Sequence, residues 1–193
     1  MMANYCTVKE VKSELSITDE SYDDMLMSMI EQAKGFLDDY CGTKFDTVSE
    51  VRYFDGAGSI LFIDDLVSVT SIKLDEDGDG TYEATMATTD YVLYPLNKTP
   101  KTYIKLTNDS DYGGFASGVR TGVKIDGTWG YQSTVPAVIR RASIIQVCRW
   151  FKRKDSAFQD VIGLPEMGQF AVYKGLDPDV RQVLEPYRKR AID

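Results

Sequence analysis

The spacing of apolar residues changes twice along this chain, and these changes limit the folds that it can adopt. Between Tyr22 and Cys41 apolar residues recur at steps of three and four, the period of an amphipathic helix. From about residue 50 to 131 they alternate, as in strands that bury one face. The helical period then returns. The sequence therefore predicts an α+β protein in which a β region interrupts a helical unit.

The predicted architecture is a helical bundle, with two N-terminal and two C-terminal helices, interrupted by a small antiparallel β barrel or sandwich. Residues 1–48 supply the N-terminal helices and residues 49–132 the inserted β region. Residues 133–193 supply the C-terminal helices, a long loop or loose hairpin over 155–176, and a tail. A chain of 193 residues is long enough to form such a domain with an insertion.

Two helix starts carry local signals. Thr7 and Glu10 have the spacing of a capping box. In this motif the Thr7 side chain accepts the backbone N–H of Glu10, and the Glu10 side chain accepts the backbone N–H of Thr7. Asp177 followed by Pro178 suits the N-cap and first position of a last, short helix. Gly42 suits the end of the long N-terminal helix.

Strand signals in the β region predict a hairpin and one long strand. Arg52–Phe54 and Ser59–Ile63 flank the turn residues 55–58, so these strands are expected to pair. Alternation from Val119 to Tyr131 predicts a single strand. The aromatic residues of the region are expected to fill its core: Tyr53, Phe54, Phe62, Tyr91, Tyr94 and Tyr103.

Composition argues against an enzyme. The chain has no histidine, which removes the commonest general base and metal ligand near neutral pH. Its three cysteines have no disulfide or zinc spacing, so we expect buried thiols in a reducing compartment such as a cytoplasm. No window approaches the about 18 apolar residues of a membrane span or resembles a signal peptide. We predict no catalytic residues, no cofactor and no membrane partner.

Charge is distributed unevenly along the chain. Residues 1–133 hold 11 basic and 23 acidic residues, whereas residues 134–193 hold 11 basic and 7 acidic ones. An acidic body repels nucleic acid, while a basic end favours an acidic partner. Stable nucleic-acid binding is therefore not expected.

The segment Asp75–Glu83, DEDGDGTYE, begins like a calcium-binding loop. Asp75, Asp77 and Asp79 alternate, and Gly80 stands at the sixth position, but the twelfth is Met86 and not the bidentate Glu of an EF-hand. The flanking residues have strand patterns, and Asp and Gly are also the residues that tight turns use. We interpret the segment as a turn. A calcium-dependent binding module that uses these three weak candidate ligands is the alternative.

The end of the helix near residue 150 combines basic and aromatic residues: Arg149, Trp150, Lys152 and Arg153. Cations complement a helix C-terminus, and Arg with aromatic residues is also typical of protein interfaces. Asp38 and Asp39 have the opposite character, since acids in a last helical turn oppose its dipole. These six residues are our candidates for a subunit interface.

Taken in order, several segments resemble the head–tail connector proteins of long-tailed bacteriophages, also called adaptor or head-completion proteins. They are TVKEVKSELSI, FLDDYCGTKFD, RYFDG, DDLVSVTSIKLDEDGDGTY, TDYVLYPLN, GTWGYQSTVPAVIRRASIIQVCRWFKRKDSAF and LDPDVRQVLEPYRK. None is a chemical signature. Their order and spacing across nearly the whole chain carry the likeness.

The resemblance implies a structural virion protein of the neck, made in the host cytoplasm. It implies a ring of identical subunits, typically twelve, under the DNA-packaging portal, although the free protein is expected to be able to stay monomeric. The ring would extend the DNA channel without holding DNA and offer a platform to the next neck or tail protein, the stopper. The last helix and tail would dock onto the portal protein through Val180, Leu184, Tyr187, Arg188, Lys189 and Arg190. Asp38 or Asp39 would meet Arg149 or Arg153 of a neighbouring copy.

Overall fold

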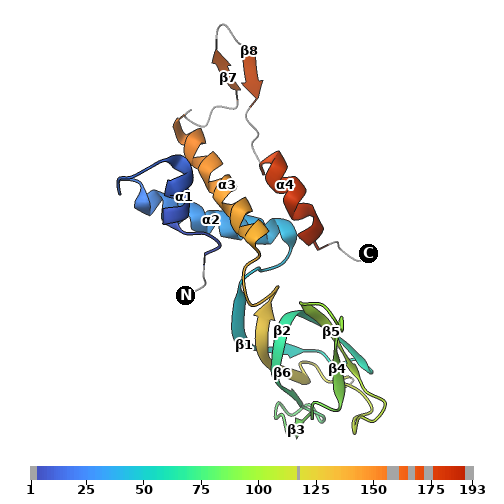
Figure 1. The fold of residues 1–193 in the computed structure, drawn as a ribbon. Coiled ribbons are helices and arrows are strands. Elements are labelled where there is room, and N and C mark those ends of the chain that lie inside the picture. The colour runs from blue at the N-terminus through green and yellow to red at the C-terminus, as the bar shows by residue number, and fades with distance from the viewer. Residues whose placement is uncertain (1–3, 117, 156–160, 165–167, 172–175, 190–193) are drawn as a thin grey trace. The chain divides into compact units, whose positions relative to one another are not determined.

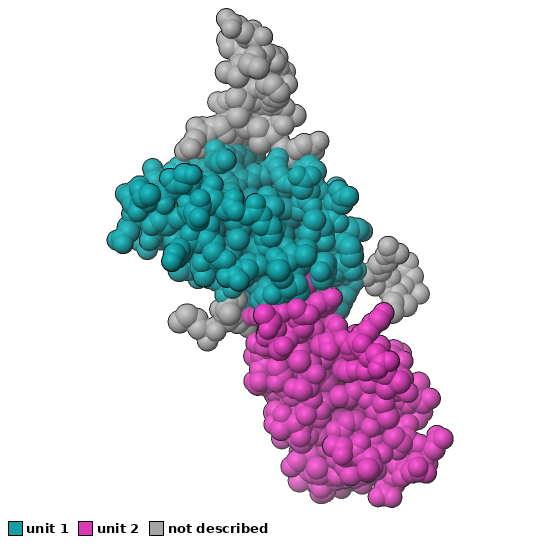
Figure 2. Space-filling view, viewed as in Figure 1, with its two compact units in different colours: residues 1–43, 135–193 teal, residues 44–134 magenta. Residues whose placement is uncertain are grey.

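The chain folds into two compact units, and each is described by itself. The computed structural model describes residues 4–116, 118–155, 161–164, 168–171 and 176–189. Unit 1 comprises residues 1–43 and 135–193, and unit 2 comprises residues 44–134 (Figure 2). Unit 1 contains the helices and one two-stranded sheet, and the regular structure of unit 2 consists of strands, so the predicted α+β class is confirmed (Figure 1).

Unit 1 contains the four helices of the described residues. They are α1 (Val8–Leu15), α2 (Asp23–Cys41), α3 (Ala137–Asp155) and α4 (Pro178–Leu184), which continues into a 3-10 turn at Glu185–Tyr187. Strands β7 (Val161–Leu164) and β8 (Gly168–Ala171) pair as a two-stranded sheet between α3 and α4. The hairpin interpretation of this region is thereby confirmed. The rest of the predicted loop lies largely outside the described residues.

Local signals set the helix ends as predicted. The capping box at α1 is complete, because the Thr7 hydroxyl accepts the Glu10 N–H and the Glu10 carboxylate accepts the Thr7 N–H. Gly42 ends α2 in the left-handed conformation, with φ of 67°. The Asp177 side chain caps α4, and Pro178 follows in its first turn.

Helix α3 is the centre of unit 1, because it contacts α1, α2 and α4. One face of α2, with Leu26, Ile30 and Ala33 fully buried, packs on Val147 and Phe151 of α3. Across the residues that are described, no helix combines the length and apolar character that crossing a membrane requires.

Unit 2 is an antiparallel sheet of six strands (Figure 1). They are β1 (Thr47–Phe54), β2 (Ile60–Leu74), β3 (Ala84–Thr85), β4 (Tyr91–Tyr94), β5 (Lys101–Leu106) and β6 (Val123–Gly130). Their order is β1-β6-β2-β5-β4, with β3 beside β2. The predicted barrel is not formed by the described strands, because no pairing joins β4 to β1 and the sheet stays open.

The predicted hairpin of residues 52–63 is wrong. Strand β1 pairs with β6, in the register Arg52↔Ile125, and β6 separates β1 from β2. The turn residues between the strands serve another purpose. Gly56 packs against the backbone of Phe115, since an added Cβ would stand 1.7 Å from the Phe115 carbonyl oxygen. The Asp55 carboxylate accepts the Thr121 N–H at 2.7 Å. The residues 55–58 therefore pack against the loop before β6 and do not close a tight turn.

The long strand predicted from Val119 begins only at Val123. Thr121 has φ of 52°, which breaks the extended backbone before the strand starts. From Val123 onward the predicted alternation holds, since Val123, Ile125 and Trp129 are buried. They form one core with Leu66 and Ile72 of β2.

Candidate functional site

Asp177 joins the start of α4 to α3. One carboxylate oxygen accepts N–H groups of the first helical turn, from Asp179 at 2.9 Å and Val180 at 3.4 Å. The other pairs with the Arg149 guanidinium, and both side chains are largely shielded from solvent. Arg149, predicted to meet an acid of a neighbouring copy, therefore has a partner within its own chain.

The apolar side of α4 is turned into unit 1. Val180 is 1% exposed and Leu184 is fully buried. The sequence predicts both as portal contacts, but buried side chains cannot reach a partner in this conformation, so they anchor the helix instead. Val183 is 43% exposed and lines, with Val138, an apolar hollow of about 340 Å³ between α3 and α4.

The basic tail lies against the C-terminal end of α2. The Lys189 N–H donates to the Cys41 carbonyl at 2.8 Å, and the Arg188 guanidinium stands 5.5 Å from the centre of the Tyr40 ring. Cations at this end complement the α2 dipole. Arg188 and Lys189 are nevertheless exposed, and Tyr187 is half-buried. Arg190 lies outside the described residues.

The two acids of α2 have different surroundings. The half-buried Asp38 carboxylate accepts the hydroxyl of Tyr5 within unit 1. Asp39 is exposed, because adjacent residues of a helix point apart. Of this predicted pair, Asp39 is the one that faces solvent.

The basic and aromatic end of α3 borders a groove on unit 1. Met25, Ser28, Met29 and Gln32 of α2 and Trp150 and Arg153 of α3 line a hollow of about 430 Å³, which we call the α2–α3 groove. The Trp150 ring packs on Phe36 of α2 with their centres 5.7 Å apart. Lys152, in the same turn of α3, is exposed. Trp150 and Arg153 thus line the α2–α3 groove. The sequence predicts only that they are close together at the end of one helix.

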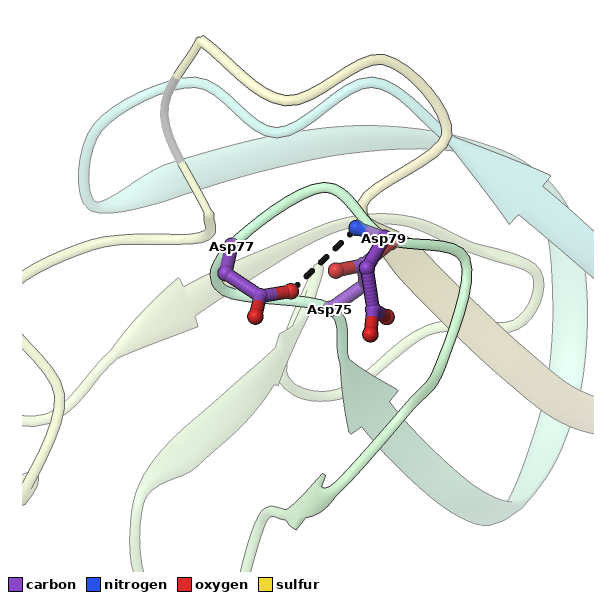
Figure 3. Close-up of side chains that lie close together, drawn as sticks. All are labelled: Asp75, Asp77 and Asp79. Atoms are coloured by element: carbon purple, nitrogen blue, oxygen red, sulfur yellow. Dashed lines mark hydrogen bonds between the residues drawn. The ribbon is translucent and has the colours of Figure 1, made fainter.

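The acidic segment is a turn between β2 and β3, as predicted (Figure 3). Asp75 is 3% exposed, and its two oxygens accept the N–H groups of Gly78 at 2.7 Å and Gly80 at 2.9 Å. Asp77 accepts the Asp79 N–H at 3.2 Å. Hydrogen bonds from Thr81 lower the pKa of Asp79. The carboxylates therefore bond the backbone of their own turn.

The same three carboxylates come within 4.8 Å of one another, which is close enough for a cation. The surroundings do not fit an EF-hand, because the segment joins strands and Met86, at the twelfth position, is buried in the core of unit 2. Both oxygens of Asp75 are also engaged by backbone donors. The geometry favours the turn over the calcium module.

The turn and the calcium module predict different effects of Asp75→Asn. The amide would leave one buried N–H without an acceptor, so the melting temperature should fall by an amount equivalent to about 1–2 kcal/mol. Asp77→Asn, on an exposed side chain of the same turn, should change it little. Adding millimolar calcium should leave the melting temperature of the wild type unchanged. A calcium-dependent rise that both substitutions abolish would contradict the turn interpretation.

Burial governs the chemistry of the thiols. Desolvation raises the pKa of Cys41 to about 11, and the nearby Asp38 carboxylate adds to the effect. Burial likewise raises the pKa of Cys6 and of Cys148. The thiolate is the nucleophilic form, so thiols that stay protonated at neutral pH do not fit nucleophilic catalysis.

Stability should decrease between about pH 9 and 11. In the unfolded chain the Cys41 thiol loses its proton near 9.0, whereas its pKa in the folded unit is about 11. Below about pH 9 the Cys41 thiol is protonated in both states. Between pH 9 and 11 the unfolded chain loses this proton while the folded unit keeps it. The free energy of unfolding of unit 1 should therefore fall by about 1–2 kcal/mol across this window. Urea unfolding across the window measures it. Equal slopes in the wild type and Cys41→Ala would contradict this cause.

The expectation that the six aromatic residues fill the β core is wrong for four of them, since only Phe54 and Tyr91 pack against this core. Phe62 is 76% exposed and Tyr53 is 52% exposed. Phe62 alternates with the buried Leu61, so it points to the other face of the sheet. The alternation itself was the available signal, but it does not tell which face of a strand is covered.

Comparison with known proteins adds family evidence to this geometry. Residues 5–71 match the family of phage gp6-like head-tail connector proteins. This segment runs from α1 through most of β2, about the first third of the chain. The resemblance to head–tail connectors is thereby confirmed for these residues. A comparison with curated proteins finds no match.

Three solved chains share the fold over nearly the full length. A chain from the virion of a native gene transfer agent (GTA) particle is 16% identical, with 96% of this chain and 90% of that chain covered and a TM-score of 0.61. A chain from the neck of the native GTA particle, computed with C12 symmetry, is 17% identical, with 100% and 97% covered and a TM-score of 0.57. A chain from the neck of the empty particle, computed with C6 symmetry, is 14% identical, with the same coverage and a TM-score of 0.54.

Proposed function

We propose that this chain is a structural neck protein of a phage-like particle, a head–tail adaptor without catalytic activity. The observation that carries the proposal is the connector-family match over residues 5–71, which continues as a shared fold with neck chains along the whole length. Copies form a ring under the portal protein, extend the DNA channel and provide the attachment platform for the next neck or tail component. The C12 symmetry of one neck favours twelve copies on the portal.

The charge distribution supports a channel that passes DNA without retaining it. Residues 1–133 carry 23 acidic against 11 basic side chains, and carboxylates on a channel wall repel phosphates. The reversed balance of residues 134–193 favours an acidic docking surface on the portal protein. Among the described residues, the portal contacts are Tyr187, Arg188 and Lys189, which are not buried. The buried Val180 and Leu184 hold α4 in place.

Deletion of the last helix is not a clean test of portal docking. Val180 and Leu184 are buried, so deletion of residues 177–193 would uncover the core of unit 1 and could unfold it. Charge reversal of exposed side chains avoids this problem. The sharper variant is Arg188→Glu with Lys189→Glu.

The experiment measures binding to the portal protein of the same particle by co-sedimentation. The double charge reversal should weaken binding about tenfold or more, with a reduced dependence on salt. Lys9→Glu reverses the charge of an exposed lysine of α1 away from the tail, and this control should bind like the wild type. A wild type that does not bind the portal protein would overturn the proposed function. Equal binding by the double variant would remove the tail as the docking element.

A further inference from the structure

One face of the sheet in unit 2 carries an aromatic ladder, in which Phe62 is exposed and Tyr103 and Tyr94 are half-buried. Phe62 of β2 stands opposite Tyr103 of β5, which stands opposite Tyr94 of β4. The next rung follows the same strands with Ile60, Lys105 and Val92. These six residues alternate with the buried Leu61 and Ile104, so they share the face opposite the core. We call them the aromatic face.

Phe62 projects from this face as a supported anchor. It is 76% exposed, the highest value among the exposed large hydrophobic residues of the described chain. Its ring lies 5.8 Å from that of Tyr103, which stacks on Tyr94 at 5.0 Å with an angle of 5° between the planes. A supported aromatic loses little conformational entropy on binding, and such residues dominate interface energies. Phe62 and Ile60 thus expose apolar surface on one face of the sheet, a feature of interaction sites.

The α2–α3 groove of unit 1 has the complementary shape and chemistry. Met25 is 38% exposed at its rim, and Met29 and Trp150 line it. Its volume of about 430 Å³ lies within the range of sites that enclose small ligands. Methionine side chains adapt to a guest, and sulfur makes favourable contacts with aromatic rings. An aromatic side chain therefore suits this groove.

The α2 side of the groove and the aromatic face carry opposite charges, while Arg153 lines the groove from α3. Lys105 belongs to the aromatic face, and Lys98 lies in the loop between β4 and β5. On α2 the acids Asp24 and Glu31 stand four and three residues from Ser28, which lines the groove. Asp39 stands three residues from Phe36, which packs on Trp150 beyond the lining residues. All five side chains are exposed, and none forms an ion pair within the part of the chain that the structure describes.

We propose that the aromatic face of one copy binds the α2–α3 groove of a second copy, with Phe62 as the anchor and lysines facing the acids of α2. The two surfaces differ, so the contact is heterologous, and repetition of a heterologous contact produces a ring when the rotation closes. The inference rests on the proposed ring and names the surfaces that form it. Charge complementarity selects another copy of this acidic chain as the occupant.

The test is zero-length cross-linking of lysine to carboxylate in an equal mixture of unlabelled and ¹⁵N-labelled chains. Links between a light and a heavy peptide arise only between copies. They should join Lys98 or Lys105 to Asp24, Glu31 or Asp39, in the free chain at high concentration and in the portal-bound assembly. Phe62→Asp should reduce their yield about 30-fold, the effect of losing an interface anchor. Tyr53→Asp, which changes another exposed aromatic of the same sheet, should preserve it.

A reciprocal pair of variants tests the direction of the contact. Met25→Glu damages the groove and leaves Phe62 intact, and Phe62→Asp does the reverse. When light Met25→Glu is mixed with heavy Phe62→Asp, links should run only from light lysines to heavy acids. Circular dichroism of each variant verifies folding, which substitution of these exposed side chains should preserve.

The outcomes separate this inference from the proposed function. Rings on the portal whose light–heavy links join other segments would overturn the inference and leave the neck function standing. So would links that persist in Phe62→Asp, or an aromatic face that cross-links only to a different protein or to DNA. If no ring forms on the portal, the proposed function fails together with the inference that rests on it.

Discussion

Replacing Trp129 with alanine should lower the free energy of unfolding of unit 2 by about 3–5 kcal/mol. Trp129 is 1% exposed, and its indole N–H donates to the Glu50 carbonyl at 2.9 Å. Its ring lies 5.6 Å from that of Phe54, and the Arg52 guanidinium stands 4.6 Å from its centre. The truncation therefore leaves a cavity between β1, β6 and β2 and removes contacts that join β1 to the sheet.

Hydrogen exchange in increasing urea measures this effect in each unit separately. Amides of β1, β2 and β6 should lose protection, while those of α2 and α3 should keep it. Trp150→Ala is the matched control, because it removes the chain's other tryptophan from the surface of unit 1. It should have a smaller effect, confined to the helices. Unchanged protection of β1 and β6 in Trp129→Ala would contradict the role assigned to Trp129.

Asp177→Ala should weaken the attachment of α4 by about 2–4 kcal/mol. The variant loses the N-cap, which contributes about 1 kcal/mol, and leaves the Arg149 guanidinium without this partner in a largely shielded position. The expected result is local, so α4 should release its hold on α3 before the rest of unit 1 unfolds.

Amide exchange at Val180 and Leu184 measures the release of α4. Asp177→Asn is the matched control, since asparagine can cap the helix but carries no charge for Arg149. It should show an intermediate loss of protection. The same protection in Asp177→Ala as in the wild type would show that burial of the two apolar side chains alone holds the helix.

Features that depend on residues close in the sequence were predictable. The capping box of Thr7 and Glu10 and the Asp177–Pro178 start act within a few residues, and the structure has both. The DEDGDG turn follows in the same way, because its carboxylates bond N–H groups two to five residues ahead. In each case the hydrogen-bonding groups lie within the motif itself.

Pairings between distant segments were not predictable from these patterns. Strand β1 pairs with β6 and not with its neighbour β2, although Asp55–Gly58 contains typical turn residues. Alternation defines two faces of a strand but does not specify its partner or the face that is covered. For this reason the sequence pattern places Phe62 in a core that it does not join.

The candidate contacts show the same limit. Charge alone suggests that Asp38 and Arg149 bind a neighbouring copy, but Tyr5 and Asp177 engage them within unit 1. Likewise, the periodicity that identifies Val180 and Leu184 as apolar cannot tell an internal surface from an external one. Only the structure identifies the exposed side chains that can form an interface.

Electron microscopy of the chain mixed with the portal protein of its particle tests the central claim most directly. The account predicts a closed ring of copies bound coaxially to the portal, with an open channel along its axis. Density for separate single copies, or a portal left bare at saturating concentrations of the chain, would contradict it.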